Sequence, residues 1–432
     1  MFLANIFGTL QKDYYICFEL VIILTAMKQA ICYIALAVVL LACSKTAENL
    51  PSKENGRLST RISLTEALGH MDDLMEELDG ADTKSCFSKS YSVDDIFSVR
   101  HLSAATKSGE ADDAADTLLY VVNFDNDEGF AVLAADRRMP AEVLCITEKG
   151  HISEELFAAA KEALEGDGAT DDSLWVPMLL LASAERTRAN IIDPGDPGPI
   201  GGGNGPGGIL GPYVQTKWNQ DGFPYDSLVP GPYAGCVIVA VAQIMAYEQY
   251  ASTMTFNGVP CTWSDMKTVH TYPNASYGGT TAGRSQVANF LYELGKPVNC
   301  NATYNEDGSP ASDSDARKTL LNYGYSNVTL HYGPTGFTDA LHSTVRNQLF
   351  AGHPAYCGGM RNISSGHVWV IDGYFAGLYH INWGWGGYSD GYYTCGVFDT
   401  SQRDSFASID SGYETSDAHF YTFGFVVITY SR

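Results

Sequence analysis

A run of proline and glycine divides the chain into two parts. Residues 193–208 read DPGDPGPIGGGNGPGG, a composition that forms neither helix nor sheet and buries no core. The chain has 432 residues, enough for a folded part on each side. We therefore expect domains at 44–192 and 209–432, joined by an exposed linker at 193–208. Such a linker is a natural site for a proteolytic cut, although a plain interdomain spacer has the same composition.

The N-terminus has the features of an export signal. From Met27 the chain reads MKQAICYIALAVVLLACSK, with a lysine, a short apolar run and then Ala42 and Cys43. This order is typical of a signal peptide, although an uncleaved anchor helix with a chance cysteine fits the same letters. Cys43 after Ala42 resembles a bacterial lipobox, in which that cysteine is lipidated and becomes the mature N-terminus. We expect residues 1–43 to be an N-terminal extension (1–26) and a lipoprotein-type signal.

Charge and cysteine spacing limit the classes of function. The formal net charge of -24 argues against a nucleic-acid partner, because no basic stripe offsets it near phosphates. The cysteines form no C-x-x-C pair, so neither a zinc site nor a redox motif is expected. We expect no metal and no cofactor. One or two disulfides among Cys261, Cys300, Cys357 and Cys395 fit the count, and the pairing stays open.

The first folded part contains helix and hairpin patterns. Leu64, Leu68, Met71, Leu74 and Leu78 follow helical spacing, and Ser63 with Glu66 matches a capping box. Two apolar runs within residues 117–146 flank an Asp/Asn/Gly turn, which predicts a β-hairpin. A helix is expected over residues 154–164.

The second part is expected to be α+β, with helices early and strands late. A helix is expected over residues 286–294, and strands over 367–374 and 378–383. The most informative segment is AGCVIVAVAQIM, residues 234–245, which is apolar after Cys236 except for one glutamine. Its length favours a buried helix, and the preceding PGPY and Gly235 prevent an earlier start.

Cys236 is therefore expected at a helix N-terminus, where the positive end of the dipole stabilises a thiolate. A small core residue is the plainer alternative. His367 stands at the mouth of a predicted strand and is the candidate base. Asn382, in NWGWGGYSDGYY, is a candidate to orient the histidine ring, with Trp383 and Trp385 covering that contact from water. Cys, His and Asn then follow in papain-like order and spacing.

Four motifs together resemble the streptopain family of bacterial cysteine peptidases, which have a papain-like fold. They are WNQDGFPYD, GCVIVAVAQIM, GHVWVIDGY and NWGWGGYSDGYY, in the family's order over residues 211–430. Residues 115–150 resemble that family's propeptide. The resemblance implies a papain-like domain with a helical part carrying the cysteine and an antiparallel sheet carrying the histidine. It also implies an inhibitory propeptide domain, itself α+β, before it.

Carried over position by position, the resemblance makes Cys236 the nucleophile and His367 the general base. Asn382 and Trp383 match the surroundings of the histidine, and Gln220 matches the side-chain donor of the oxyanion hole. The chain departs from the family pattern at Ile238 and Val239, where the family has small residues. A second departure is AYEQY after AQIM, which includes Glu248.

The sequence thus predicts an exported, secreted or lipid-anchored cysteine endopeptidase made as a zymogen. Its partners would be protein or peptide substrates and its own propeptide, with membrane contact only through the lipid anchor. Two alternative hypotheses assume the same fold. The protein would be a catalytically altered surface protein that binds peptides, or another acyl transferase that uses the same Cys-His-Asn site. In a third hypothesis, the first domain is a binding adhesin.

Overall fold

The computed structural model describes most of the chain after residue 60. The described residues are 61–80, 89–100, 117–139, 141–165, 174, 176–181, 184, 209–271, 277–306, 308–333, 336–360, 366–395 and 423–432. The expected signal, Cys43 and the linker at 193–208 lie outside them. None of the helices within this described part is long and apolar enough to cross a membrane.

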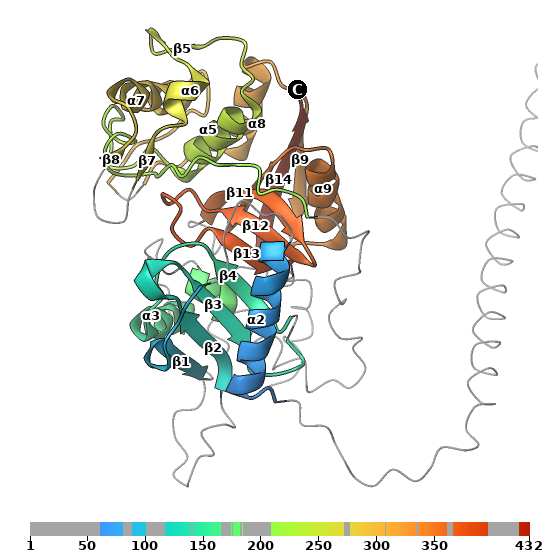
Figure 1. Ribbon diagram of the computed structural model, residues 1–432. Helices are drawn as coiled ribbons and strands as arrows, with labels where there is room; N and C mark the ends of the chain where they lie inside the picture. The colour runs from blue at the N-terminus through green and yellow to red at the C-terminus, as the bar shows by residue number, and fades with distance from the viewer. Residues whose placement is uncertain are drawn as a thin grey trace, which may run out of the picture. The chain divides into compact units, whose positions relative to one another are not determined.

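Among the described residues, the first part contributes two longer helices, a short helical segment at 176–181 and four strands (Figure 1). The longer helices and the strands are α2 (Leu64–Gly80), β1 (Ile96–Arg100), β2 (Thr117–Asn123), β3 (Phe130–Ala134), β4 (Val143–Thr147) and α3 (Glu154–Glu165). The expected hairpin is confirmed, because β2 and β3 pair antiparallel. The capping box is confirmed on one side, since the Glu66 N–H donates to Ser63 Oγ at 3.3 Å. Helix α3 confirms the helix expected over 154–164.

The second part begins with helices and ends with strands. Its helices are α5 (Cys236–Glu248), α6 (Trp263–Met266), α7 (Thr281–Gly295), α8 (Asp313–Asn322) and α9 (Asp339–Phe350). Its longer strands are β9 (Ser326–Gly333), β10 (Ala355–Met360), β11 (Gly366–Phe375), β12 (Leu378–Asn382), β13 (Gly391–Thr394) and β14 (Phe423–Ser431). Four two-residue strands form two small hairpins: β5 (Thr255–Phe256) with β6 (Val259–Pro260), and β7 (His270–Thr271) with β8 (Tyr277–Gly278). The α+β expectation is confirmed.

One antiparallel sheet runs through both parts. Its ten strands lie in the order β1-β2-β3-β4-β13-β12-β11-β10-β14-β9, and β4 joins the two parts by pairing with β13. The sequence did not predict this continuity, because alternating apolar residues indicate a strand but not its partner. The first part is therefore attached to the second by backbone hydrogen bonds as well as by side chains.

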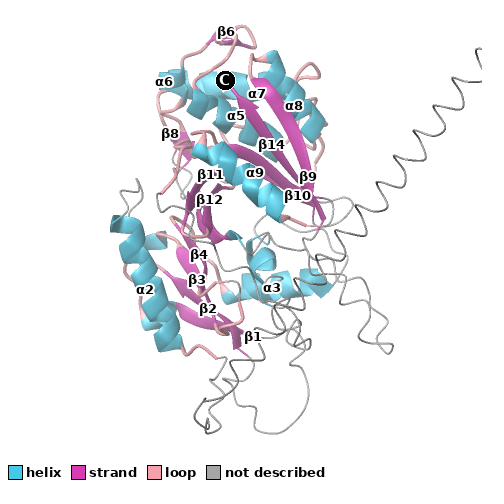
Figure 2. Ribbon diagram, turned by 90° about the vertical axis from the view of Figure 1, so that its right-hand side faces the viewer, coloured by secondary structure: helices cyan, strands magenta, loops and turns pink. Residues whose placement is uncertain are grey.

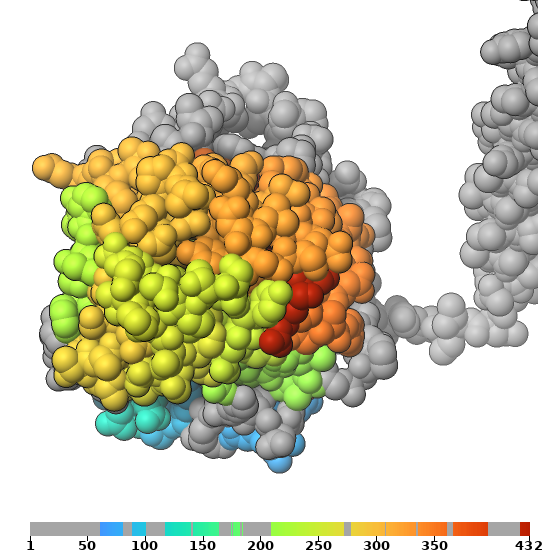
Figure 3. Space-filling view, turned by 90° about the horizontal axis from the view of Figure 1, so that it is seen from above, coloured from blue at the N-terminus to red at the C-terminus, as the bar shows by residue number. Residues whose placement is uncertain are grey.

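Helices cover the second half of the sheet on both faces (Figure 2). Along β11, Val368 and Val370 pack in the cluster that contains α5, whereas Trp369 and Ile371 pack in the cluster that contains α9. This alternation follows from the two-residue repeat of a strand, and it places α5 and α9 on opposite faces. Seen from above, residues of the second part form most of the coloured surface, and the dark red end of the chain in β14 reaches that surface (Figure 3).

Candidate active site

Cys236 is the first residue of α5, as the sequence predicted. Gly235 caps the helix with φ of 100°, a conformation that residues with a side chain rarely adopt. A Cβ on Gly235 would also lie 2.7 Å from the carbonyl oxygen of Ser309. The turn therefore requires glycine immediately before the thiol. Most of α5 is buried while Cys236 is half-buried, so the helix is held firmly and its first side chain stays accessible.

His367 is the second residue of β11, near the start of a strand in the middle of the sheet's second half. Its side chain is buried, and its Nε2 lies 3.0 Å from the carbonyl oxygen of Trp383. Because a carbonyl only accepts, Nε2 is the nitrogen that carries the proton in this contact. The ring also stacks on Trp385, with centroids 4.7 Å apart and planes 26° apart. These contacts fix the ring and leave Nδ1 as its basic nitrogen.

Asn382 does not occupy the position the sequence predicted for it. Its side chain donates to the carbonyl oxygen of Thr216 at 3.0 Å and accepts from Gln243 Nε2 at 2.8 Å. Its backbone pairs with Val370 on β11, so its side chain lies on the α5 side of the sheet. His367 alternates with Val368 and lies on the other set of positions. The contact to the imidazole therefore comes from the backbone of the next residue, Trp383.

Gln220 provides a buried donor at the site. Its side chain is 7% exposed, and its Nε2 has no hydrogen-bond partner. Burying an amide donor without a partner costs about 1–3 kcal/mol, which is uncommon unless the group serves a ligand. The N–H groups of the first helical turn have no acceptor within the helix, and Cys236 opens that turn. An amide donor and a helix-start N–H are the two donors that an oxyanion hole requires.

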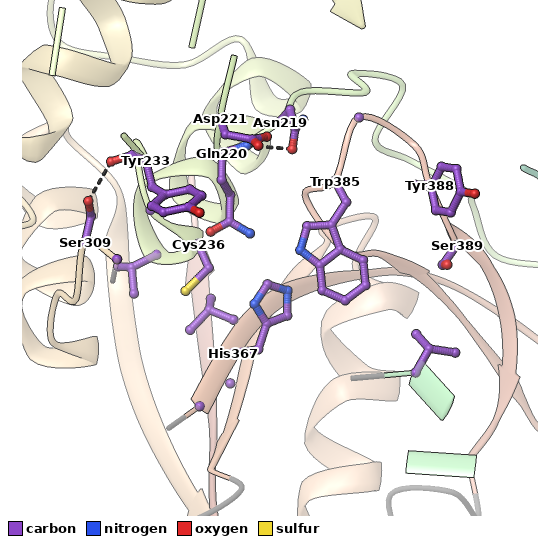
Figure 4. Close-up of a pocket in the computed structure, with 18 of the residues that line it drawn as sticks. Asn219, Gln220, Asp221, Tyr233, Cys236, Ser309, His367, Trp385, Tyr388 and Ser389 are labelled. Carbon is purple, nitrogen blue, oxygen red and sulfur yellow. Dashed lines mark hydrogen bonds between the residues drawn. The ribbon is translucent and has the colours of Figure 1, made fainter. Parts of the chain in front are cut away.

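Cys236, His367, Gln220 and Trp385 line one cavity of about 1290 Å³. Figure 4 shows the Cys236 sulfur beside the His367 imidazole, with the Gln220 amide above them and the Trp385 indole beside the ring. Three of the five predicted site residues thus meet in one place. Trp383 contacts His367 through its carbonyl oxygen. Asn382 does not contact the imidazole in the hydrogen bonds given above, and its side chain binds Thr216 and Gln243 instead.

Gln243, the single polar residue of the buried segment, belongs to the site although no motif indicated it. Gln243 is fully buried, and its Oε1 lies 3.3 Å from the Trp218 N–H and 3.2 Å from Thr216 Oγ1. Its Nε2 donates to Asn382. One amide therefore connects the helix of Cys236, the segment leading to Gln220 and the strand leading to Trp383. A lone glutamine in an otherwise apolar helix was the available signal, since a buried amide needs partners.

Ile238 and Val239 are accommodated inside the fold. Both side chains are fully buried, and a Cβ added at Gly384 would lie 3.2 Å from Val239 Cγ1. The bulk of Val239 therefore packs directly against the glycine that follows Trp383. Glu248, at the far end of α5, pairs with His353 at 2.7 Å and with Tyr430 Oη at 3.1 Å, away from the cavity.

Four of the other five described thiols are buried, whereas Cys395 is half-buried like Cys236. All six described cysteines are free, so the disulfides entertained among Cys261, Cys300, Cys357 and Cys395 are absent. Burial raises the pKa of Cys300 and of Cys395 to about 12, and it also raises the pKa of Cys145, Cys261 and Cys357. Among the described residues, no cluster of His, Cys, Asp and Glu could hold a metal ion.

The first part of the chain forms one wall of the same cavity. The residues it contributes are Phe130, Lys149, His151, Ile152, Leu156, Val176 and Pro177. A cluster of charges lies at the junction of the two parts. Glu148 contacts Lys217 Nζ at 3.0 Å and His380 Nε2 at 3.2 Å, while Asp390 contacts the same lysine at 3.0 Å. The junction therefore combines backbone pairing with partly buried ion pairs.

Comparison with known proteins agrees with this geometry. Residues 218–393, which hold Gln220, Cys236, His367 and Trp383, match the Peptidase C10 family. Thiol protease/hemagglutinin PrtT of Porphyromonas gingivalis is 26% identical over 344 residues, 71% of this chain and 37% of that protein. Streptopain of Streptococcus pyogenes is 26% identical over 212 residues, 41% of this chain and 52% of that protein.

The chain thus spans about half or less of the curated relatives it matches. Among solved structures, a fragment of Prevotella intermedia prointerpain A is similar, with a TM-score of 0.47 and 22% identity. That match covers 72% of this chain and 94% of the fragment.

Proposed function

We propose that this protein is a cysteine endopeptidase made as a zymogen. The observation that carries the proposal is the meeting of Cys236, His367 and a partnerless Gln220 amide in one cavity. A nucleophile, a base and an oxyanion donor are the groups that acyl transfer through a thioester needs. Two relatives are named as a thiol protease and as streptopain, which fits the same reaction class.

In the proposed mechanism, His367 takes the thiol proton and Cys236 attacks the peptide carbonyl carbon as thiolate. The carbonyl oxygen becomes an oxyanion held by Gln220 Nε2 and the N–H of Cys236. When the C–N bond breaks, His367 gives its proton to the leaving amine, and the acyl group remains on sulfur. Water, deprotonated by His367, then attacks the thioester and releases the acid. Asn382 and Trp383 hold the histidine in position.

The first part of the chain is proposed to inhibit the enzyme. Its residues stand in the wall of the cavity, and the β4–β13 pairing holds them there. A cut in the linker at 193–208 would leave this part attached only by noncovalent contacts. We further propose export, with Cys43 as the lipid anchor of the envelope-bound form. Protein and peptide substrates and the chain's own propeptide are then its partners.

The test compares the full-length protein with Cys236→Ala on casein, following casein hydrolysis and conversion of the precursor. We expect both to be lost in Cys236→Ala and retained in a matched Cys261→Ala variant, because Cys261 is buried outside the cavity. Hydrolysis by Cys236→Ala at the wild-type rate would refute the proposal. Peptide binding without cleavage would favour a binding protein, and transfer to an added amine in preference to water would favour an acyl transferase.

A further inference from the structure

A buried carboxylate binds the residue whose carbonyl oxygen contacts the imidazole. Asp390 stands immediately before β13 and is fully buried. Its Oδ1 accepts a hydrogen bond from the Trp383 N–H at 2.9 Å, and the carbonyl oxygen of Trp383 lies 3.0 Å from His367 Nε2. Trp383 thus connects a carboxylate, on its amide side, with the base of the site, on its carbonyl side. Asp390 is not among the residues that line the cavity.

The sheet does not set the direction of the Trp383 backbone. Strand β12 ends at Asn382, and its pairing with β13 ends one residue earlier. Gly384 follows with a φ of 77°, which turns the chain out of the strand direction. Backbone groups beyond the end of a ladder need other partners. Here side chains provide them, since Asp390 accepts from the Trp383 N–H and Asn382 Oδ1 accepts from the Gly384 N–H at 3.1 Å.

The second oxygen of Asp390 forms an ion pair, because Oδ2 lies 3.0 Å from Lys217 Nζ. Burial raises the pKa of Asp390, and the charge of Lys217 and the Trp383 hydrogen bond oppose that effect. A buried ion pair is weak evidence for stability, because apolar residues of similar volume often stabilise a core as well or better. An apolar residue at position 390 would leave the Trp383 N–H without this acceptor. The carboxylate is therefore better explained by the group it holds than by the stability it adds.

We propose that Asp390 is a positioning residue for His367. By holding the Trp383 N–H, it keeps the Trp383 carbonyl directed at the imidazole, so that Nε2 stays the protonated nitrogen and Nδ1 the basic one. The inference rests on the proposed function, in which His367 is the base, and deepens it by adding the residue that fixes the orientation of this base. Asp390 acts through Trp383 and leaves the bond-breaking to Cys236 and His367.

The fold contains a matched control in Asp372, which is also fully buried. Its Oδ2 accepts from the Val214 N–H at 2.8 Å, and its Oδ1 lies 2.6 Å from His380 Nδ1. Asp372 therefore has the same combination as Asp390, one backbone donor and one basic side chain. Its backbone donor, however, belongs to a residue that neither lines the cavity nor precedes the carbonyl at His367.

The main test follows the proton on His367 Nε2 and needs no catalysis. Full-length Cys236→Ala, isotopically labelled at the histidine nitrogens, should show a slowly exchanging Nε2–H signal that is absent in Cys236→Ala/His367→Gln. Adding Asp390→Ala should speed the exchange of this proton at least about tenfold, because its acceptor is no longer held. Adding Asp372→Ala should change the exchange rate less than about twofold, since that site is independent. Equal rates in the Asp390→Ala and Asp372→Ala proteins would overturn the inference.

A second pair of variants covers the case in which Asp390→Ala does not fold. Lys217→Met/Asp390→Leu removes the ion pair together with the acceptor, whereas Lys217→Met/Asp390→Asn removes the ion pair and keeps an acceptor for the Trp383 N–H. Replacing both partners leaves no unpaired charge between them. In the Cys236→Ala protein, the first pair of changes should abolish slow exchange and the second should retain it. The same result in both would refute a role for the acceptor.

Kinetics separate this inference from the proposed function. Each single variant is converted by tagged wild-type protein, which is removed before the assay. In Asp390→Ala, kcat should fall about 10- to 100-fold, the cost of a misplaced catalytic group, while KM changes less than about twofold. Asp372→Ala should keep the wild-type kcat. Equal kcat in the two variants would refute the positioning role and leave the peptidase proposal intact. No hydrolysis by wild type, with the exchange difference retained, would refute the peptidase and support the positioning role.

Discussion

At the scale of single residues, the site depends on a hydrogen-bond donor and a proton acceptor that line the cavity. The donor is the amide of Gln220 and the acceptor is the imidazole of His367. Gln220 is the clearest case, since its Nε2 is buried without a partner. Its backbone is held on both sides. Its N–H donates to Asn219 Oδ1 at 2.8 Å, and its carbonyl accepts from the Ala234 N–H at 2.6 Å. The amide is thus positioned before any substrate arrives, which is what transition-state stabilisation requires.

We predict that Gln220→Ala lowers kcat about 100- to 1000-fold, the cost of one oxyanion donor. The same change should leave the free energy of unfolding unchanged or slightly higher, because it removes a buried donor that had no partner. Peptide kinetics and urea unfolding of the same preparations check both. A fall in kcat that merely follows a loss of stability would point to a structural role.

The sequence predicted which side chains meet at the site, but it did not predict the contacts that backbone groups make there. Cys236, His367 and Gln220 meet as expected because side-chain chemistry and motif spacing are written in the sequence. The partner of His367 is a carbonyl oxygen of Trp383, a group that every residue carries and that no motif distinguishes.

At the scale of elements, helix α5 is buried and its one polar buried amide, Gln243, has hydrogen-bond partners on two other segments. Apolar run length and the capping glycine predicted the helix and its start at Cys236. Neither predicted that Gln243 binds Asn382 and the Trp218 N–H, since those partners lie on other elements. The hairpin of β2 and β3 was predictable because a short turn makes its pairing local.

We predict that Gln243→Leu reduces the free energy of unfolding by about 1–3 kcal/mol, because it leaves a buried N–H without an acceptor. It should also lower kcat, since Trp218 and Asn382 lose their common anchor. Gln286→Leu is the matched control, for its Oε1 accepts from the Thr262 N–H at 2.8 Å away from the cavity. Unfolding curves and kcat, measured at a temperature where both variants are folded, decide the point. Equal kcat losses in the two variants would contradict a positioning role for Gln243.

At the scale of the whole molecule, one sheet and one charge cluster join the two parts of the chain. His380 lies between Asp372 Oδ1 at 2.6 Å and Glu148 Oε1 at 3.2 Å. Burial alone lowers the pKa of His380, but the two carboxylates outweigh burial and raise it to about 10. Lys217 and Asp390 complete the cluster. Neither the β4–β13 pairing nor this cluster was predictable, because long-range partners leave no local pattern.

The His380 shift predicts how stability depends on pH. A histidine whose pKa is higher in the folded state stabilises fully below its unfolded pKa of about 6.5 and loses that contribution as pH rises towards 10. Urea unfolding of Cys236→Ala, which cannot process itself, should therefore show a falling free energy of unfolding over this range. Cys236→Ala/His380→Gln should show a smaller fall. Parallel pH profiles would contradict the assignment.

The central claim is that Cys236 carries the acyl group during turnover. Acid quenching of the protein during cleavage of a peptide ester, followed by mass spectrometry of its digest, measures this directly. The account predicts that, in the wild-type protein, the digest fragment that contains Cys236 carries the mass of the acyl group. The Gln220→Ala/Cys236→Ala variant should carry no such mass. An acyl group on another residue, or substrate turnover with no acyl-protein at any quench time, would contradict it.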